Sequence, residues 1–280
     1  MTPQCAPPIS AADRTAVRRP AILLAVAAGV LVSCGQDDPG TAVRECRPVV
    51  ALVASSVKAA FGESAGNTCA DVWKVTGGSS TALAAQVQEG SPADVFVSAG
   101  SKAVDQLRSA GLTVGEPVPL GSVRATLLVP VSLEGTVTLR DLPARVAGGW
   151  KVGACVASAP CGTMADQLLA NASEVWGAGF DRESIVSTEA ESADGLVSRI
   201  AMGELDAGII YEYACGPVGG TSDTTVRCID IPDTVDGHVL NVRTPYFAVR
   251  LNTSDNAESF MDHVGSAGFR DFLSKWLRIS

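Results

Sequence analysis

The sequence predicts an α/β protein of two units, each a mixed but mainly parallel sheet flanked by helices. Three observations predict this fold class. Short β-prone runs alternate with helical runs, which is typical of parallel βαβ units. The alternation is interrupted near Gly121 and then resumes. At 280 residues, the chain is long enough to fold as two such units.

The elements of the first unit follow from β-prone runs, each bounded by small residues or a breaker. We expect strands at 49–53, 71–75 and 94–98, and helices at 57–61, from Ser80 to the breaker at 90–92, and at 104–109.

The second unit repeats this order of elements. We expect strands at 125–129, 151–156 and 207–211, helices at 163–170 and 193–202, then a last strand at 246–249 and a helix at 260–277. Crossings near 122 and 244 would divide the chain into one lobe of residues 46–122 plus 245–280 and a second lobe of residues 123–244.

The N-terminus is predicted to be an export signal rather than part of the fold. Arg14, Arg18 and Arg19 precede an uncharged apolar run at 21–32, which is too short to span a bilayer as a mature helix. The following "LVSC" resembles the lipobox of bacterial lipoproteins, which would make Cys34 the lipidated first residue. Residues 1–33 would then be the signal peptide and 34–45 a polar tether. The alternative is an ordinary signal peptide with an incidental cysteine.

Composition and charge narrow the function classes. Apolar residues make up 46% of the chain and charged residues 18%, as in globular proteins. The formal net charge of −9 argues against a nucleic-acid partner, because phosphate backbones are met by basic surfaces. An anionic ligand would therefore have to be held by local geometry rather than by a long-range positive field.

The cysteines indicate disulfides. Besides Cys5 in the leader and Cys34, six remain, an even number in a chain expected to be exported. Pairing of sequence neighbours would join Cys46 to Cys69, Cys155 to Cys161, and Cys215 to Cys228. Zinc and redox sites are the alternatives. No CxxC pair occurs, and His238 and His263 lie apart from the cysteines.

Three strand-to-helix junctions carry small or hydroxyl residues: Ser55-Ser56, Ser79-Ser80 and Pro160-Cys161-Gly162. Helix N-termini offer free backbone N–H groups to anions, and the carboxyl ends of parallel strands meet at one edge of a sheet. The junctions therefore predict an oxyanion site without any lysine. The alternative is that these serines are ordinary helix caps.

Four motifs resemble those of the bacterial molybdate-binding proteins, the receptors of ABC-type uptake systems. "ASSVKAAF" at 54–61 resembles "AASLxxAL", and "GGSSTALAAQVQEGSPADVFVSA" at 77–99 resembles "GSSxxLAxQIxxGAPADVFISA". "APCGTMADQLL" at 159–169 is similar to "VPAGxYAxxAL", and "VSRIAMGELDAGIIYEYA" at 197–214 to "ALxxVxxGEADAGIVYxTDA". The resemblance implies the two-lobed type II periplasmic-binding-protein fold, with two hinge crossings.

In that family a tetrahedral oxyanion lies between the lobes, held by hydroxyls and backbone N–H groups. The resemblance implies two serine ligands, Ser56 and either Ser80 or Ser79. It also implies the backbone N–H groups of Cys161 and Ala193 and the phenol of Tyr211. Cys161 stands where the family has alanine. Glu191 and Asp194 add acid where the family commonly has "NVR", which places the Ala193 contact in question. Asp94 is expected to be a structural carboxylate.

Together with the lipobox-like "LVSC", the resemblance predicts a monomeric receptor that is lipid-anchored on the outer face of the cytoplasmic membrane. It would capture molybdate, and also tungstate, for an ABC permease, and would need no cofactor and no metal other than the oxyanion. Selectivity over sulfate would rest on cavity size, since both are dianions. The alternatives are a sulfate or phosphate receptor, a secreted serine hydrolase using Ser56 or Ser80, and a structural lipoprotein. A hydrolase is disfavoured because no G-x-S-x-G elbow occurs.

Overall fold

The computed structural model describes residues 47–64, 72–215 and 225–277. The predicted signal peptide 1–33, the tether 34–45, the lipidation site Cys34 and the Cys46–Cys69 bridge lie outside the described residues.

The strands are paired in one continuous order, β2-β1-β3-β11-β4-β7-β5-β6, with β8 also pairing with β4. The strands of the first lobe are β2 (Trp73–Gly78), β1 (Val49–Ala54), β3 (Val95–Ala99), β11 (Arg243–Arg250) and the first part of β4 (Val114–Pro130). The second lobe contains the rest of β4, with β7 (Ala207–Tyr211), β5 (Val152–Cys155), β6 (Thr188–Ala190) and β8 (Val226–Ile229). A short ribbon is formed by β9 (Thr234–Val235) and β10 (His238–Val239).

Each lobe has a parallel group of strands. In the first lobe β1 runs parallel to β2 and β3, while β11 is antiparallel to β3. In the second lobe β5 runs parallel to β6 and β7, while β4 is antiparallel to β7 and β8. The predicted α/β class with mixed strand pairing is confirmed, although the two lobes share one sheet in which four of the pairings are parallel and four antiparallel.

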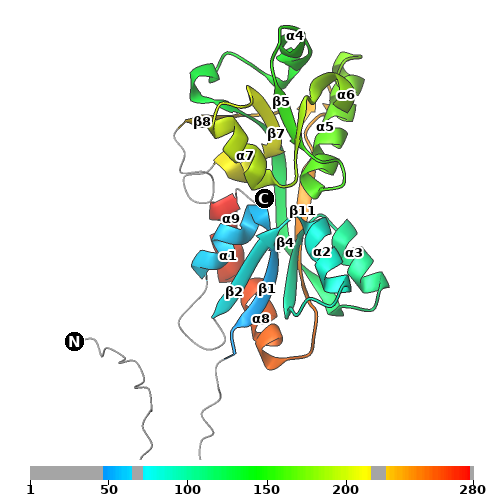
Figure 1. Ribbon diagram of the computed structural model, residues 1–280, viewed down its shortest axis with the longest axis vertical. Helices are drawn as coiled ribbons and strands as arrows, with labels where there is room; N and C mark the ends of the chain where they lie inside the picture. The colour runs from blue at the N-terminus through cyan, green and yellow to red at the C-terminus, as the bar shows by residue number, and fades with distance from the viewer. Residues whose placement is uncertain (1–46, 65–71, 216–224, 278–280) are drawn as a thin grey trace, which may run out of the picture. The chain divides into compact units, whose positions relative to one another are not determined.

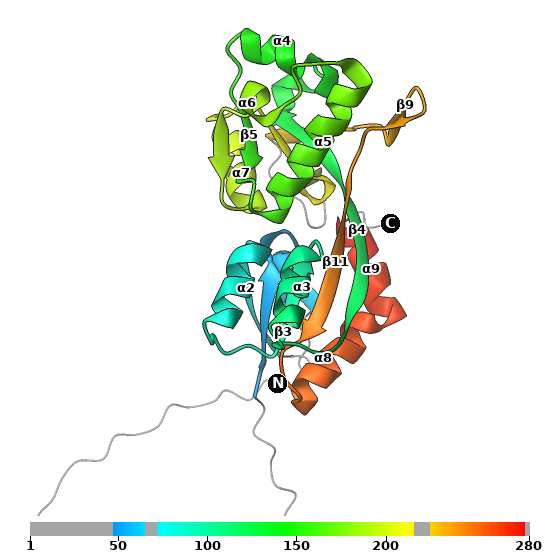
Figure 2. The same cartoon turned by 90° about the vertical axis from the view of Figure 1, so that its right-hand side faces the viewer.

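Helices cover the faces of both sheets (Figures 1 and 2). Those of the first lobe are η1 (Ser55–Val57), α1 (Lys58–Ser64), α2 (Ser80–Gln88), α3 (Lys102–Ser109), α8 (Asp255–Gly265) and α9 (Ala267–Leu277). Those of the second lobe are η3 (Val131–Leu133), η4 (Leu139–Asp141), α4 (Leu142–Ala147), α5 (Pro160–Trp176), α6 (Arg182–Ile185), α7 (Ala193–Ala201) and η5 (Glu212–Cys215).

Strand β1 shows why these runs are apolar throughout. Successive side chains of a strand point to opposite faces, and here helices bury both faces. Ala51 and Val53 belong to the larger core, and Leu52 to the smaller core, which also contains Leu83 and Leu107. Both faces of the sheet are therefore covered by helices, and only the carboxyl ends of the strands remain accessible to a ligand.

Two long strands connect the lobes. β11 pairs with β4 from Arg250 opposite Val114 to Arg243 opposite Arg124. The predicted crossings lie side by side in this ladder, because Thr244 pairs with Val123. Figure 2 shows both strands running from one lobe to the other. The boundaries 46–122 plus 245–280 and 123–244 stay a prediction, since strand pairing alone does not define where a hinge bends.

Several predicted elements have different bounds in the structure. β4 begins at Val114, well before the strand expected at 125–129. The helix expected at 260–277 is two helices, separated at Ser266, whose backbone is extended. α5 begins at Pro160 rather than Thr163, because proline is well tolerated in a first helical turn. The amide of Cys161 therefore belongs to the first turn of a helix.

Candidate functional site

Four strand-to-helix junctions meet around one small cavity of about 20 Å³. They are the starts of η1, α2, α5 and α7, two from each lobe. The lining residues are Ala54, Ser55, Ser56, Gly78, Ser79, Ser80, Ala99, Pro160, Cys161, Ser192, Ala193 and Tyr211. Because about 10–15 Å³ of such space holds one water molecule, the cavity suits a compact ligand.

All six residues that the sequence suggested as ligands line this cavity: Ser56, Ser79, Ser80, Cys161, Ala193 and Tyr211. They come from five different elements and are separated by up to 155 positions, as the numbers of Ser56 and Tyr211 show. Their proximity agrees with the predicted site, while their contact with a ligand stays a prediction.

The serines of the first lobe are not ordinary helix caps. The N-cap of η1 is Ala54, and Ser79, the N-cap of α2, makes no side-chain capping bond. Ser80 Oγ accepts a hydrogen bond from the Ala99 amide at 3.0 Å. A hydroxyl carries one proton, so that of Ser80 is left to donate elsewhere. Capping therefore does not explain these hydroxyls.

Ser56 has a partner that the sequence did not suggest. Its Oγ lies 2.7 Å from the Tyr246 hydroxyl, and both side chains are buried. Tyr246 was expected only as part of a strand. Its role beside the cavity left no local signal, because the two residues are 190 positions apart.

In the second lobe the loop between β5 and α5 is held from two sides. The predicted Cys155–Cys161 disulfide closes it, and the predicted Cys215–Cys228 disulfide is also present, away from the cavity. Arg182 donates to the carbonyl oxygens of Cys155, at 3.1 Å, and Gly162, at 3.3 Å. The loop therefore presents the start of α5 in a defined position.

Gly162 allows this loop to be tight. A Cβ atom at this position would lie 2.0 Å from the carbonyl oxygen of Val156, far inside any tolerable contact. Glycine is required here for close approach of two backbone segments rather than for a turn.

The start of α7 forms the fourth wall. Ser192 caps this helix, accepting from the Gly195 amide at 3.2 Å, and Ala193 is its buried first residue. Since the first N–H groups of a helix have no intrahelical acceptor, the Ala193 amide is available to a ligand. The acidic neighbours Glu191 and Asp194 do not line the cavity.

Tyr211 supplies an unpaired buried hydroxyl. Its side chain is buried at the end of β7, and among the described residues its phenolic oxygen is the buried side-chain polar atom without a hydrogen-bond partner. Thr244 is close enough to influence the pKa of Tyr211 but completes no hydrogen bond. Burial raises that pKa well above its usual value, so the group is a neutral donor. An unpaired buried hydroxyl costs about 1–3 kcal/mol, which a ligand would recover.

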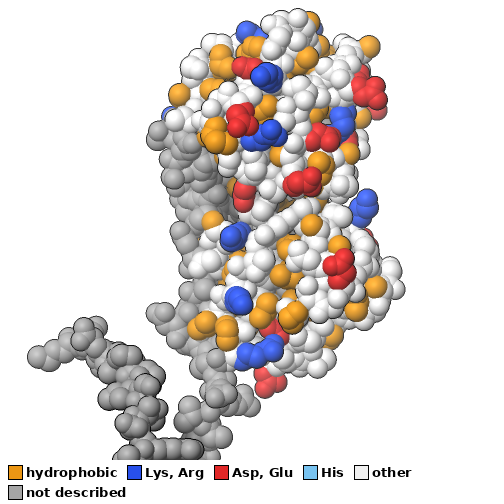
Figure 3. Space-filling model, viewed as in Figure 1, with side chains coloured by type: hydrophobic (Ala, Val, Ile, Leu, Met, Phe, Trp, Pro, Cys, Tyr) orange, Lys and Arg blue, Asp and Glu red, His pale blue; other side chains and the backbone are white. Residues whose placement is uncertain are grey.

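No ionisable acid or base lines the cavity within the described residues, Tyr211 and the bridged Cys161 apart. Asp194 lines a separate cavity with Lys58 and accepts from the Tyr213 hydroxyl at 2.6 Å. Partial burial of the carboxyl group raises the pKa of Asp194, although part of the residue remains exposed. On the face in Figure 3, acidic and basic side chains are interspersed, without a broad basic patch.

The other candidate residues lie elsewhere. Asp94 is buried and accepts from the Val50 amide and the Asn252 side chain, both at 2.8 Å, and from Arg47, so it is structural as expected. His263 contacts Ser64 at 3.1 Å, and His238 is in β10. Neither histidine lines the cavity, and the described residues contain no cluster of metal-ligating side chains.

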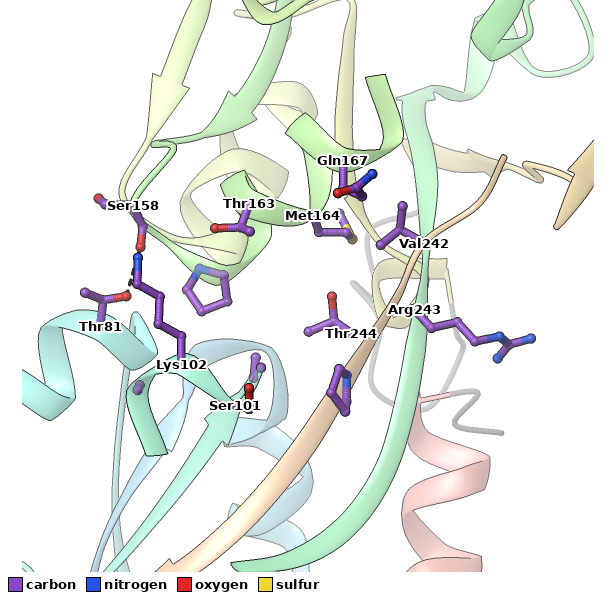
Figure 4. A pocket seen from close by; sticks show the side chains of 15 residues that line it. Thr81, Ser101, Lys102, Ser158, Thr163, Met164, Gln167, Val242, Arg243 and Thr244 are labelled. Carbon is purple, nitrogen blue, oxygen red and sulfur yellow. Dashed lines mark hydrogen bonds between the residues drawn. The ribbon is translucent and has the colours of Figure 1, made fainter. Parts of the chain in front are cut away.

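A larger cavity of about 290 Å³ adjoins the small one and shares Ala99 and Pro160 with it (Figure 4). Val242, just before β11, and Thr244, near the start of β11, line one side. Thr81 donates to the carbonyl oxygen of Ser158 at 2.9 Å, so the two lobes touch in this structure. The small cavity therefore lies between lobes that are already in contact.

Comparison with known proteins agrees with this arrangement. Residues 48–276 match the family model described as bacterial extracellular solute-binding protein. Over 254 residues the chain is 28% identical to the molybdate-binding protein ModA of Mycobacterium tuberculosis, covering 88% of this chain and 91% of that protein.

Two solved structures share the fold. The periplasmic molybdate-binding protein of Azotobacter vinelandii is 18% identical, with a TM-score of 0.60 over 81% of this chain and 97% of that one. The sulfate-binding protein SubI of M. tuberculosis is 15% identical, with a TM-score of 0.67 over 82% of this chain and 85% of that one. These likenesses confirm the type II periplasmic-binding-protein fold.

Within the described residues no helix is both long and apolar enough to cross a membrane. The family model spans most of the chain, and the fold is that of two-lobed receptors. The chain belongs to the bacterial extracellular solute-binding proteins, a family of exported proteins.

Proposed function

We propose that this protein is a receptor that captures molybdate, and also tungstate, between its two lobes and delivers it to an ABC permease. One observation carries the proposal. Ser56, Ser79, Ser80, Cys161, Ala193 and Tyr211, which the family motifs single out as ligands, line one small cavity without a charged side chain. The name of the mycobacterial relative supports the choice of anion.

Neutral donors are sufficient for such a ligand. Hydrogen bonds to a charged group contribute roughly 1.5–3 kcal/mol each. A helix N-terminus adds about 0.3–1 kcal/mol when exposed and up to about 2 kcal/mol when partly buried. The hydroxyls of Ser80 and Tyr211 and the amides at four helix starts supply these interactions. We infer that the anion replaces water without any counter-charge from lysine or arginine.

The lining also favours a fully deprotonated anion. Phosphate retains a proton near neutral pH and needs a buried acceptor, and no carboxylate lines the cavity within the described residues. Sulfate makes the same demand for donors as molybdate, so the choice between them rests on cavity size. In the described part of the chain, no histidine lines the cavity with Ser56 and Ser80, which supports a binding protein rather than a serine hydrolase.

Closure of the lobes about β4 and β11, near residues 122 and 244, would trap the anion.

We further propose that Cys34 carries the lipid anchor at the outer face of the cytoplasmic membrane. The basic residues, apolar run and lipobox-like "LVSC" support this anchor. We also propose that the protein acts as a monomer.

Calorimetric titration of the purified protein with molybdate, tungstate, sulfate and phosphate tests the proposal. We expect one site per chain that binds molybdate and tungstate much more tightly than sulfate, and that does not bind phosphate. Preference for sulfate would reassign the ligand, and no binding of any of the four would refute the oxyanion receptor.

A further inference from the structure

Tyr246 lies directly behind Ser56, outside the lining of the cavity. The two hydroxyl oxygens are 2.7 Å apart, and the tyrosine side chain is fully buried. Among the described residues, Ser56 is the only hydrogen-bond partner of the Tyr246 hydroxyl. A buried phenol whose single partner lines a cavity can control how that partner presents its proton to a ligand.

The backbone fixes where this phenol points. Tyr246 is in β11, where it pairs with Ala99 on one side and Gly121 on the other. Ala99 itself lines the cavity, and its amide donates to Ser80. The tyrosine is therefore held in a sheet beside the cavity wall, and its hydroxyl has little freedom to leave Ser56.

The pair has two possible directions. Each hydroxyl has one proton to donate. If Ser56 donates to Tyr246, the serine presents only lone pairs to the cavity and repels an anion. If Tyr246 donates to Ser56, the serine proton is released toward the cavity. An anion selects the second direction, and hydrogen bonds arranged in such a chain strengthen one another.

Tyr246 always has a proton for this purpose. Burial raises its pKa above the usual value for tyrosine; the hydrogen bond with Ser56 lowers it in part, and the nearby Asp194 raises it. The phenol therefore keeps its proton near neutral pH.

We propose that Tyr246 is a positioning residue for the oxyanion: its hydroxyl donates to Ser56 Oγ and thereby turns the Ser56 proton into the cavity. This inference rests on the proposed function, because it requires an anion beside Ser56. It assigns a role to a residue that the motifs did not single out, and it makes the effect of Tyr246 dependent on Ser56.

Molybdate titrations of the wild type, Tyr246→Phe, Ser56→Ala and the double variant test this dependence. We expect Tyr246→Phe to weaken binding about five- to tenfold and Ser56→Ala roughly 10- to 100-fold. The double variant should bind like Ser56→Ala alone. Thr126→Val is the matched control, because it also removes a buried hydroxyl, one that donates to the Ile229 carbonyl oxygen away from the cavity.

A spectroscopic measurement separates positioning from general damage. The chain has three tyrosines, Tyr211, Tyr213 and Tyr246, so labelling of the tyrosine ζ-carbon with carbon-13 gives three NMR signals. Each is assigned by its Tyr→Phe variant. Molybdate should shift the Tyr211 and Tyr246 signals in the wild type. In Ser56→Ala, the Tyr246 signal should no longer respond to molybdate.

The outcomes are distinct. If Tyr246→Phe binds molybdate like the wild type, or if the two losses multiply in the double variant, the positioning role is refuted while the receptor stands. A Tyr246 signal that responds equally in Ser56→Ala refutes it as well. If the wild type binds no oxyanion, the proposed function is refuted and this inference with it.

Discussion

The two lobes offer donors of different kinds to the same cavity. The first lobe contributes the side-chain hydroxyls of Ser56, Ser79 and Ser80. The second contributes helix-start amides at Cys161 and Ala193, and one phenol, that of Tyr211. In the second lobe, the Cys155–Cys161 disulfide also restrains the loop between β5 and α5.

This difference bears on which substitutions each lobe would tolerate at the predicted site. A hydroxyl donor is lost when the side chain is replaced, whereas an amide donor depends only on where the backbone lies. As a predicted backbone donor, position 161 would accept cysteine where the resembling family has alanine, because the amide is the same. An amide donor, however, requires that the loop keep its position. The disulfide, the hydrogen bonds of Arg182 and the close backbone approach at Gly162 hold it there.

The largest effect is expected from Gly162→Ala. The added Cβ would collide with the Val156 carbonyl oxygen and displace the start of α5. We expect about 3 kcal/mol of lost stability and more than about 100-fold weaker molybdate binding. Thermal melting and calorimetry measure both. Gly268→Ala is the control, since its Cβ would meet nothing within 4 Å. Normal binding by Gly162→Ala would contradict the view that backbone position matters most in this lobe.

Tyr211→Phe removes the one side-chain hydroxyl that the second lobe presents among the predicted ligands. Affinity should fall roughly 10- to 100-fold, the value of a hydrogen bond to a charged group. Stability without the anion should rise by about 1 kcal/mol, because the lost hydroxyl is buried and unpaired. Urea unfolding without ligand and titration with molybdate give the two values. A variant that loses stability would show that the hydroxyl is paired in solution.

Separate replacement of Ser80 and Ser79 by alanine decides which serine is the ligand. Ser80→Ala leaves the buried Ala99 amide without its acceptor. Stability should therefore fall by about 1–3 kcal/mol, and affinity for molybdate by about tenfold. Ser79 makes no capping bond, so Ser79→Ala should change stability by less than about 0.5 kcal/mol. A larger affinity loss in Ser79→Ala would reverse the assignment.

Replacement of both Cys155 and Cys161 by alanine tests the role of the bridge. Stability should fall by about 2 kcal/mol in the chain-entropy model, and affinity a few-fold because the loop loosens. The matched control replaces Cys215 and Cys228, whose bridge spans 13 positions away from the cavity. That variant should lose about 3 kcal/mol of stability and none of its affinity. Equal affinity losses would mean that the effect is global.

The smallest effect is expected from Asp194→Asn. Removing a negative charge near the cavity should tighten molybdate binding about twofold, because the carboxylate is partly exposed and screened. Its raised pKa means that the folded protein keeps this proton to higher pH than the unfolded chain. Its contribution to stability is therefore complete below pH 3.8 and falls as pH rises above that value.

Unfolding measured across this pH range should show a shallower fall in Asp194→Asn. Asp105→Asn, which changes an exposed carboxylate on α3, serves as the control. Weaker molybdate binding by Asp194→Asn would show that the carboxylate supports the site instead of opposing anions.

Local patterns in the sequence were sufficient for much of the fold. β1, β3, β5 and β7 lie close to their predicted bounds, because buried parallel strands are apolar runs of characteristic length. The two described disulfides followed from proximity in sequence. The start of β4 was missed, because its glycines and prolines resemble a loop, and only pairing with β11 makes it a strand.

The candidate ligands were also named from the sequence, through the resemblance to a known family. What only the tertiary structure decided is how their protons and amides are arranged. The Ser56–Tyr246 pair and the unpaired Tyr211 hydroxyl depend on side chains brought together from distant strands. Hydrogen bonding and burial are properties of neighbours in space, and the order of residues along a chain does not record them.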